Sequence, residues 1–145
     1  MRKSLIAALV IAVSSPAVIA ASVFSDAKDS VEYRQAAFQL IRHNMADIGD
    51  MVKGDVKFEQ ERVIKRANAL ATLTTLPWDA FTVKGGSAKA EIWDNLADFE
   101  SRAEKFSADA AELQTAALKG DQGDIRKAFG AFARNCKACH NKYKD

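Results

Sequence analysis

Hydrophobic residues recur every three or four positions along most of the chain, which is the period of one face of an α-helix. Between residues 26 and 52 this stripe consists of Val31, Phe38, Ile41, Met45, Ile48 and Val52. Ser25 or Asp26 can cap the start of such a helix with a side-chain oxygen, and Gly54 can end it. Alternating, strand-like runs are scarce, so the pattern predicts an all-α protein.

Three more amphipathic helices are predicted, over residues 56–73, 90–119 and 121–143. Their inward positions are, in chain order, Val63, Ile64, Ala67, Leu70 and Ala71; Ile92, Leu96, Phe99, Ala103, Phe106, Ala110, Leu113 and Ala117; and Ile125, Phe129, Phe132, Cys136, Cys139 and Tyr143. Asp55 is the expected N-cap of the 56–73 helix, Pro77 prevents its continuation, and Gly120 ends the 90–119 helix. A loop over 74–89 contains Gly85-Gly86. Because the connections are short, we predict an antiparallel up-down-up-down four-helix bundle.

The N-terminal segment differs from this pattern. Arg2 and Lys3 precede an apolar run that ends in small residues at Ala20, which indicates a secretory signal peptide over residues 1–20, cleaved near 20–22. An uncleaved membrane anchor is the alternative. Residues 23–145 suffice for one domain with a single core. Cleavage would leave 19 basic and 19 acidic residues, so we expect a formally neutral periplasmic domain without nucleic-acid or membrane partners.

Both cysteines of the chain lie in one motif near its end, Cys136-Lys137-Ala138-Cys139-His140. C-x-x-C-H is typical of covalent c-type haem attachment, in which two thiols add to the haem vinyl groups and the histidine binds the iron. On a helix, residues three apart lie on one face, about 5–6 Å from each other. We therefore predict one haem c per chain, covalently attached through Cys136 and Cys139, with His140 as the metal ligand.

A disulfide, a redox dithiol and a zinc site are the alternatives for this motif. An exported chain could oxidise the pair to a disulfide. A catalytic dithiol has its first cysteine at a helix N-terminus, where the thiol pKa is lowered; here the pair lies near the end of the last helix. Zinc needs four ligands, and His43 is the only further histidine. Haem attachment accounts best for the full motif in an exported chain.

Arg34 lies on the inward face of the first predicted helix, one turn before Phe38, with Gln35 beside it. A charged group at an inward position needs a partner. Haem propionates are one candidate, because the guanidinium fork matches carboxylate geometry. The other candidates are a carboxylate side chain and solvent at the end of the bundle.

Several segments of the chain resemble the cytochromes c′. They are Val31-Glu32-Tyr33-Arg34-Gln35-Ala36-Ala37-Phe38, Leu76-Pro77-Trp78, Glu91-Ile92-Trp93, Ala128-Phe129-Gly130 and the terminal motif. The resemblance implies a bacterial periplasmic four-helix haem protein, usually a homodimer, whose five-coordinate iron has a histidine as its only protein ligand. It also implies that Arg34 and Gln35 contact the haem propionates and that Ser87 approaches the haem, at a position where relatives often carry Asp.

Two positions depart from the pattern of this family. Phe38 stands where Leu or Met is commoner, over the distal haem face. A phenyl ring can neither ligate iron nor donate a conventional hydrogen bond, although core packing alone would also explain it. Lys144, four residues after His140, stands where relatives often carry Arg; it keeps the charge and lacks the planar fork. Its alternative role is that of a cation at a helix C-terminus.

These features favour a non-enzymatic protein that binds small diatomic gases, NO and CO, at a distal site covered by Phe38. Bound O₂ depends more on a hydrogen-bond donor than NO or CO do, so an apolar distal face favours the latter two. The alternative is a six-coordinate electron-transfer cytochrome, with Met45 as sixth ligand and a redox partner. A peroxidase-like enzyme has less support, because no distal His–Arg pair is evident in the sequence.

Overall fold

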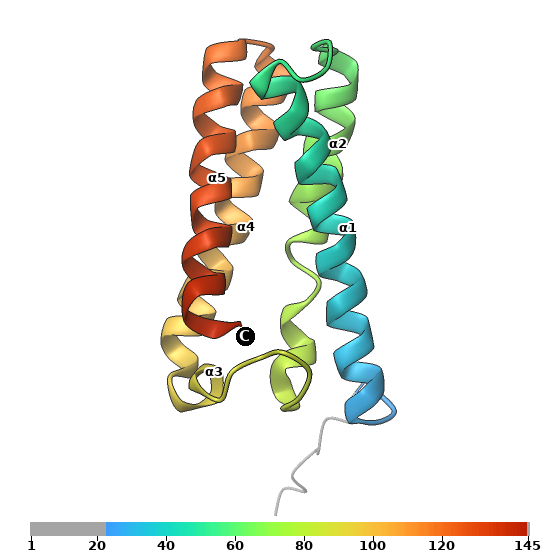
Figure 1. Cartoon of the computed structure of the whole chain (residues 1–145), viewed down its shortest axis with the longest axis vertical. Helices are drawn as coiled ribbons and strands as arrows, with labels where there is room; N and C mark the ends of the chain where they lie inside the picture. The colour runs from blue at the N-terminus through green and yellow to red at the C-terminus, as the bar shows by residue number, and fades with distance from the viewer. Residues whose placement is uncertain (1–22, 145) are drawn as a thin grey trace, which may run out of the picture.

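The computed structural model describes residues 23–144, so the predicted signal peptide lies outside the described residues. Four long helices stand side by side and alternate in direction (Figure 1): α1 (Ala27–Lys53), α2 (Gln60–Leu73), α4 (Leu96–Lys119) and α5 (Gln122–Tyr143). The 3₁₀ helix η1 (Trp78–Thr82) and the short helix α3 (Glu91–Asp94) lie between α2 and α4. The predicted antiparallel four-helix bundle is confirmed.

The ends of α1 and α4 follow the expected capping chemistry. Asp26 is the N-cap of α1, and its carboxylate accepts a hydrogen bond from the Asp29 amide at 2.8 Å. Gly54 and Gly120 end α1 and α4 with φ values of 87° and 85°. This left-handed conformation favours glycine because it has no Cβ, so the sequence placed both helix ends correctly.

The predicted start of the second helix is wrong. The helix begins at Gln60 rather than at 56, and the residue before it is Glu59, not Asp55. The Asp55 and Val56 amides instead donate to the Asp50 carbonyl at 2.9 and 3.4 Å. The chain after Gly54 is therefore bound to the last turn of α1. Phe58 packs against the core in the non-helical segment that precedes α2.

The predicted 90–119 helix is interrupted at Asn95, where φ is −139° and ψ is 61°. Ile92 is buried and the indole Trp93 Nε1 donates to the Phe81 carbonyl at 2.7 Å, so α3 is held in a different direction from α4. Asparagine favours helices weakly, which makes the break inexpensive. One consequence is that Leu96, predicted to point inward, is 45% exposed.

The long helices are amphipathic, and their buried faces meet in one main core. Fully buried members include Ile48, Leu70, Leu113, Ile125 and Phe132. Phe132 of α5 stacks on Phe106 of α4, with ring centroids 4.7 Å apart. A smaller cluster of Ile92, Phe99 and Tyr143 forms beside the end of α5. Within residues 23–144, no helix carries a long enough apolar stretch to cross a membrane.

α1 leans with respect to α5. The two helices approach each other at the end where α1 finishes and α5 begins, and they diverge toward the opposite end (Figure 1). Gly49 lies at the close approach, where a Cβ atom would be 3.0 Å from Cζ of Phe129. The absence of a side chain at Gly49 therefore permits the contact, and toward the other end of the bundle the α1 and α5 backbones lie farther apart (Figure 1).

Replacing Phe132 with alanine should lower the free energy of unfolding by about 3–5 kcal/mol, because the change leaves a cavity at a fully buried ring that the core cannot refill. Urea denaturation followed by circular dichroism measures this loss. Leu118→Ala is the matched control: Leu118 is 61% exposed, and its loss should stay at about 0.5 kcal/mol or less. Equal losses for the two variants would contradict the core described here.

Candidate haem site

Cys136 and Cys139 lie one turn apart on α5 and are both half-buried free thiols. Cys136 packs against the main core, and its Sγ is 3.8 Å from Sδ of Met45. Cys139 packs against the smaller cluster around Phe99. Both side chains therefore face the bundle, as their place on the apolar stripe predicts.

Burial makes these thiols weak acids. It raises the pKa of Cys136 to about 12 and also raises the pKa of Cys139. A redox dithiol needs the opposite, a lowered thiol pKa that supplies the thiolate nucleophile. The electrostatics of the site thus disfavour the dithiol alternative and leave two protonated thiols beside an apolar surface.

His140 follows Cys139 directly and lies at the exposed edge of the same turn. Partial burial, and secondly the charge of Lys144, lower the pKa of its imidazole. The neutral ring that results near pH 7 is the form that binds a metal. The Lys144 amide also donates to the His140 carbonyl at 3.1 Å, which closes the last turn of α5. Lys144 therefore lies beside the predicted ligand.

Phe38 of α1 lies at the level of this turn, as two contacts between the antiparallel helices α1 and α5 indicate. Met45 meets Cys136, and Gly49 meets Phe129. In an antiparallel pair, each step back along α1 corresponds to one step forward along α5. The Met45–Cys136 contact therefore places Phe38 level with residue 143, and the Gly49–Phe129 contact places it level with residue 140. Phe38 is therefore level with residues 140–143, whereas the same counts place Met45 level with residues 133–136, about 6–11 Å from His140 along the axis.

Phe38 belongs to an aromatic wall. Its ring centroid is 5.7 Å from that of Trp78 and 6.4 Å from that of Phe81, both in edge-on arrangements. The indole Trp78 Nε1 donates to the Thr74 carbonyl at 2.6 Å, so this polar group is already engaged. His43, the other histidine, is exposed on α1.

The Arg34 guanidinium binds backbone carbonyls of the loop that follows η1. Nη1 donates to the carbonyls of Ala80 and Val83 at 2.9 and 2.8 Å, and Nη2 donates to the carbonyl of Gly85. Its Cζ lies 4.6 Å from the ring centroid of Phe81. Carbonyls were not among the partners that the sequence suggested. A guanidinium has five N–H donors, so these bonds leave two, and the propionate contact stays a prediction.

The loop around Gly86 joins Arg34 and Gln35 to the end of α5. A Cβ on Gly86 would lie 3.4 Å from Nε2 of Gln35, so the loop backbone runs against α1. Ser87 is exposed beside it. Farther along, Ala88 forms an isolated antiparallel bridge with Lys144. The predicted residues of the first helix, the loop and the terminal motif thus meet at one end of the bundle.

Asp98 is a residue of this region that the sequence analysis missed. Its carboxylate accepts hydrogen bonds from Arg102 Nε at 2.7 Å, from Lys142 Nζ at 2.9 Å and from the Tyr143 hydroxyl. The spacing of Asp98 and Arg102 by four residues was a visible signal of a helical ion pair. The donors from α5 were not, because they depend on how α4 and α5 pack.

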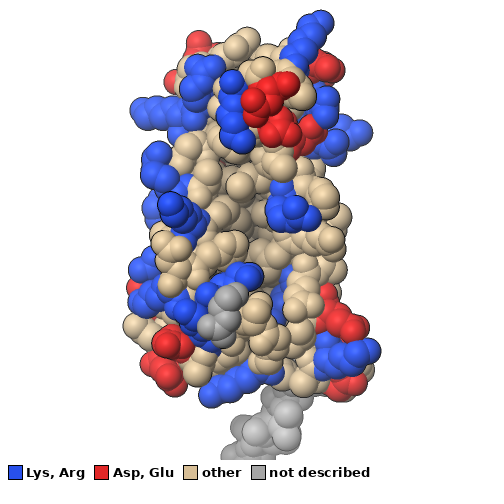
Figure 2. Space-filling model, viewed as in Figure 1, with Lys and Arg blue, Asp and Glu red and all other residues tan. Residues whose placement is uncertain are grey.

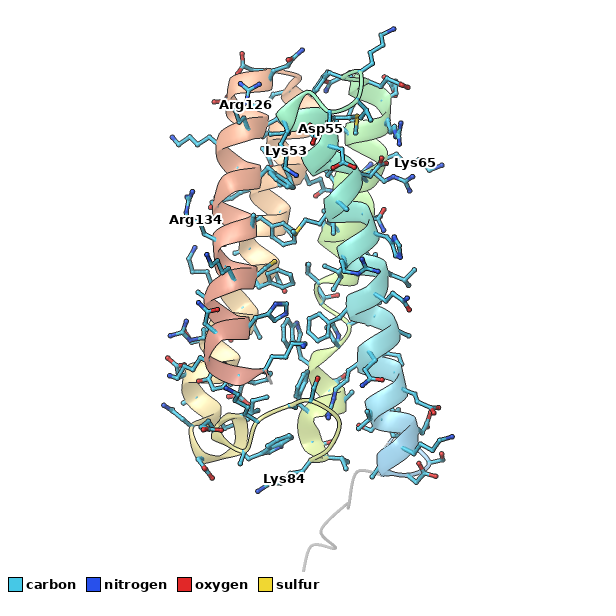
Figure 3. All side chains as sticks on the ribbon, viewed as in Figure 1. Lys53, Asp55, Lys65, Lys84, Arg126 and Arg134 are labelled. Atoms are coloured by element: carbon cyan, nitrogen blue, oxygen red, sulfur yellow. The ribbon has the colours of Figure 1, made fainter. Side chains whose placement is uncertain are left out.

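The residues of this end of the bundle fit a haem. An uncharged band runs between α5 and α1, with lysine and arginine side chains on its flanks (Figure 2). Arg134 points away from α1, on the outer side of α5 (Figure 3). Two thiols one turn apart, an adjacent neutral imidazole and an aromatic wall across from them match the donor set and the apolar surroundings that a covalently attached porphyrin requires.

Comparisons with known proteins agree with this geometry. The profile of the cytochrome c′ family matches residues 29–144. A cytochrome c′ from Alcaligenes xylosoxydans xylosoxydans is 35% identical over 123 residues, covering 83% of this chain and 97% of that protein. The structure of cytochrome c prime from Shewanella frigidimarina is 40% identical, with a TM-score of 0.81 and coverage of 84% and 98%. A nitrosyl complex of a variant of cytochrome c prime from Alcaligenes xylosoxidans has the same TM-score and coverage at 35% identity.

Fold, motif and relatives together define a c-type haem protein built on a four-helix bundle. Haem c is its cofactor, and Cys136 and Cys139 provide the two thiols for covalent attachment. The chain belongs to the cytochrome c′ family.

Replacing Arg34 with alanine should release the loop over residues 80–86, because three carbonyls lose a charged donor. We expect the free energy of unfolding to fall by roughly 2–4 kcal/mol, measured by urea denaturation, and the amides of Gly85 and Gly86 to exchange hydrogen faster. Arg42→Ala, on the exposed side of α1, is the control and should change stability by about 0.5 kcal/mol at most. Unchanged loop exchange in Arg34→Ala would contradict this role.

Proposed function

We propose that this cytochrome is a periplasmic, non-enzymatic haem protein whose five-coordinate iron binds NO and CO on the side covered by Phe38. The observation that carries the proposal is the pairing of His140 with Phe38 at one level of the bundle. His140 supplies a neutral imidazole from α5, and the side chain opposite it on α1 is a hydrocarbon ring. The bound haem supplies an iron with one open coordination position.

The aromatic wall offers no free hydrogen-bond donor to a ligand on the iron, and this determines which gases it favours. The phenyl rings of Phe38 and Phe81 have no hydrogen-bonding group, and the indole N–H of Trp78 is engaged by the Thr74 carbonyl. NO and CO bind well in apolar surroundings, whereas O₂ loses a stabilising hydrogen bond there. The nitrosyl complex known for a variant of a relative adds support.

The electron-carrier alternative is weaker on this geometry. Met45 packs against Cys136, with 3.8 Å between their sulfur atoms, and Phe38 rather than Met45 is level with the turn of His140. The two contacts place Met45 about 6–11 Å from the level of His140 along the axis, so its thioether would have to leave the Cys136 thiol, and α1 would have to shift, for it to reach the sixth position.

We also propose that Arg34 and Gln35 contact the propionates and that Ser87 approaches the haem. Arg34 keeps two N–H donors for such a contact, and Gln35 and Ser87 lie at the same end of the bundle. A homodimer is the assembly that the family resemblance implies. Tyr33 and Leu40, 40% and 54% exposed and two turns apart on α1, provide apolar surface for it; sedimentation measures the assembly.

Absorption spectra of the oxidised and reduced protein test the coordination directly. We expect high-spin, five-coordinate bands in both states, because the α1 side chain level with His140 is the phenyl ring of Phe38, which cannot ligate iron. Addition of NO or CO should then produce new bands. A low-spin reduced spectrum with a Met–iron charge-transfer band would show the six-coordinate alternative to be correct.

Phe38→Ala should speed CO association by about tenfold or more, since removal of a ring that crowds the binding path lowers the barrier by at least about 1.4 kcal/mol. Flash photolysis of the CO complex measures the rate. Leu40→Ala, on the exposed side of the same helix, is the control and should leave it unchanged. Equal rates in the Phe38 variant and the parent protein would show that Phe38 does not cover the iron.

A further inference from the structure

Asp98 links the first turn of α4 to the last turn of α5. From α4 it accepts hydrogen bonds from Arg102, and from α5 it accepts them from Lys142 and Tyr143. These bonds hold the pKa of Asp98 well below its usual range. The bond from Arg102 has the largest effect, followed by those from Tyr143 and Lys142. The carboxylate is therefore charged at neutral pH and can act as a permanent acceptor for all three side chains.

The partners of Asp98 belong to the same turn as His140. Tyr143 is 3% exposed, and its ring packs edge-on against Phe99 with centroids 5.4 Å apart. Its backbone carbonyl accepts a hydrogen bond from the Lys89 amide at 3.1 Å. The turn is thus held by Asp98 from α4, by an aromatic contact and by the loop, and Asp98 provides the only charged anchor among these three.

The imidazole of His140 has no hydrogen-bond partner of its own among residues 23–144. Metal-binding histidines ordinarily donate their second ring N–H to a carboxylate or a carbonyl, and this contact sets the orientation of the ring. In this protein the last turn of α5 sets the position of the His140 Cα–Cβ bond, from which the imidazole reaches the iron. Contacts that fix this turn therefore set the point from which the ring is presented.

We propose that Asp98 is the positioning residue for His140: by holding Lys142 and Tyr143, it sets the height and rotation of the turn that presents the imidazole, and so determines the strength of the bond between the imidazole nitrogen and the haem iron. The inference rests on the proposed ligation by His140. It extends the functional site to α4, a helix that carries none of the site residues predicted from the sequence.

The test compares Asp98→Ala and Asp98→Asn in the haem-loaded protein. The measurements are the iron–histidine stretching band of the reduced protein by resonance Raman spectroscopy, the reduction potential, and hydrogen exchange of the last-turn amides of α5. In Asp98→Ala we expect a shifted, broader band, a changed potential and about tenfold faster exchange, as loss of charged hydrogen bonds predicts. Asp98→Asn, which can still accept from Tyr143, should give smaller shifts in the same direction.

Asp47 provides a matched control. It is a partly buried carboxylate that accepts from two arginines, Arg62 and Arg66, and links α1 to α2. Asp47→Ala should lower stability without moving the iron–histidine band. If Asp98→Ala keeps the parental band and potential, its role is structural only and the inference is wrong. If the parent protein itself shows no iron–histidine band, the proposed ligation fails first, and the inference fails with it.

Discussion

Phe132 stacks on Phe106 in the middle of the bundle, and this contact between α4 and α5 fixes the helix that carries the haem motif. Asp109, 3% exposed, adds a hydrogen bond from Asn135, the residue before Cys136, at 3.2 Å. Rotation of α5 about its axis would break both contacts. The direction in which the two thiols point is therefore decided by packing on the same face of α5, one turn before Cys136, where Phe132 is held in the main core.

Periodicity predicted the parts of this structure that depend on burial alone. All four predicted helices have C-terminal ends within a residue of the observed ones, and the inward positions of α5 are buried or half-buried. The misplaced features depend on backbone contacts. α2 starts later in the chain than predicted because the Asp55 and Val56 amides bind the Asp50 carbonyl. α3 and α4 are separate helices because the Trp93 indole binds the Phe81 carbonyl. Neither hydrogen bond produces a periodic pattern of hydrophobic residues from which it could be predicted.

The candidate site shows the same division. The C-x-x-C-H motif consists of consecutive residues, so haem attachment could be predicted from the sequence alone. The place of Phe38 near the haem was predicted from the family resemblance. The partners of charged groups could not be found in this way. Arg34 binds the carbonyls of Ala80, Val83 and Gly85, which are about 50 residues away in the chain, and Asp98 gathers two donors from the other end of the sequence. The sequence shows which side chains are charged, whereas only the fold shows which groups they bind.

The missing side chain at Gly49 has a consequence for the spacing of the two helices. α1 comes close to α5 at this glycine and diverges from it toward the end of the bundle that carries Phe38 and Arg34 (Figure 1). A methyl group at this position would lie 3.0 Å from the tip of the Phe129 ring, so either that ring or the α1 backbone would have to shift.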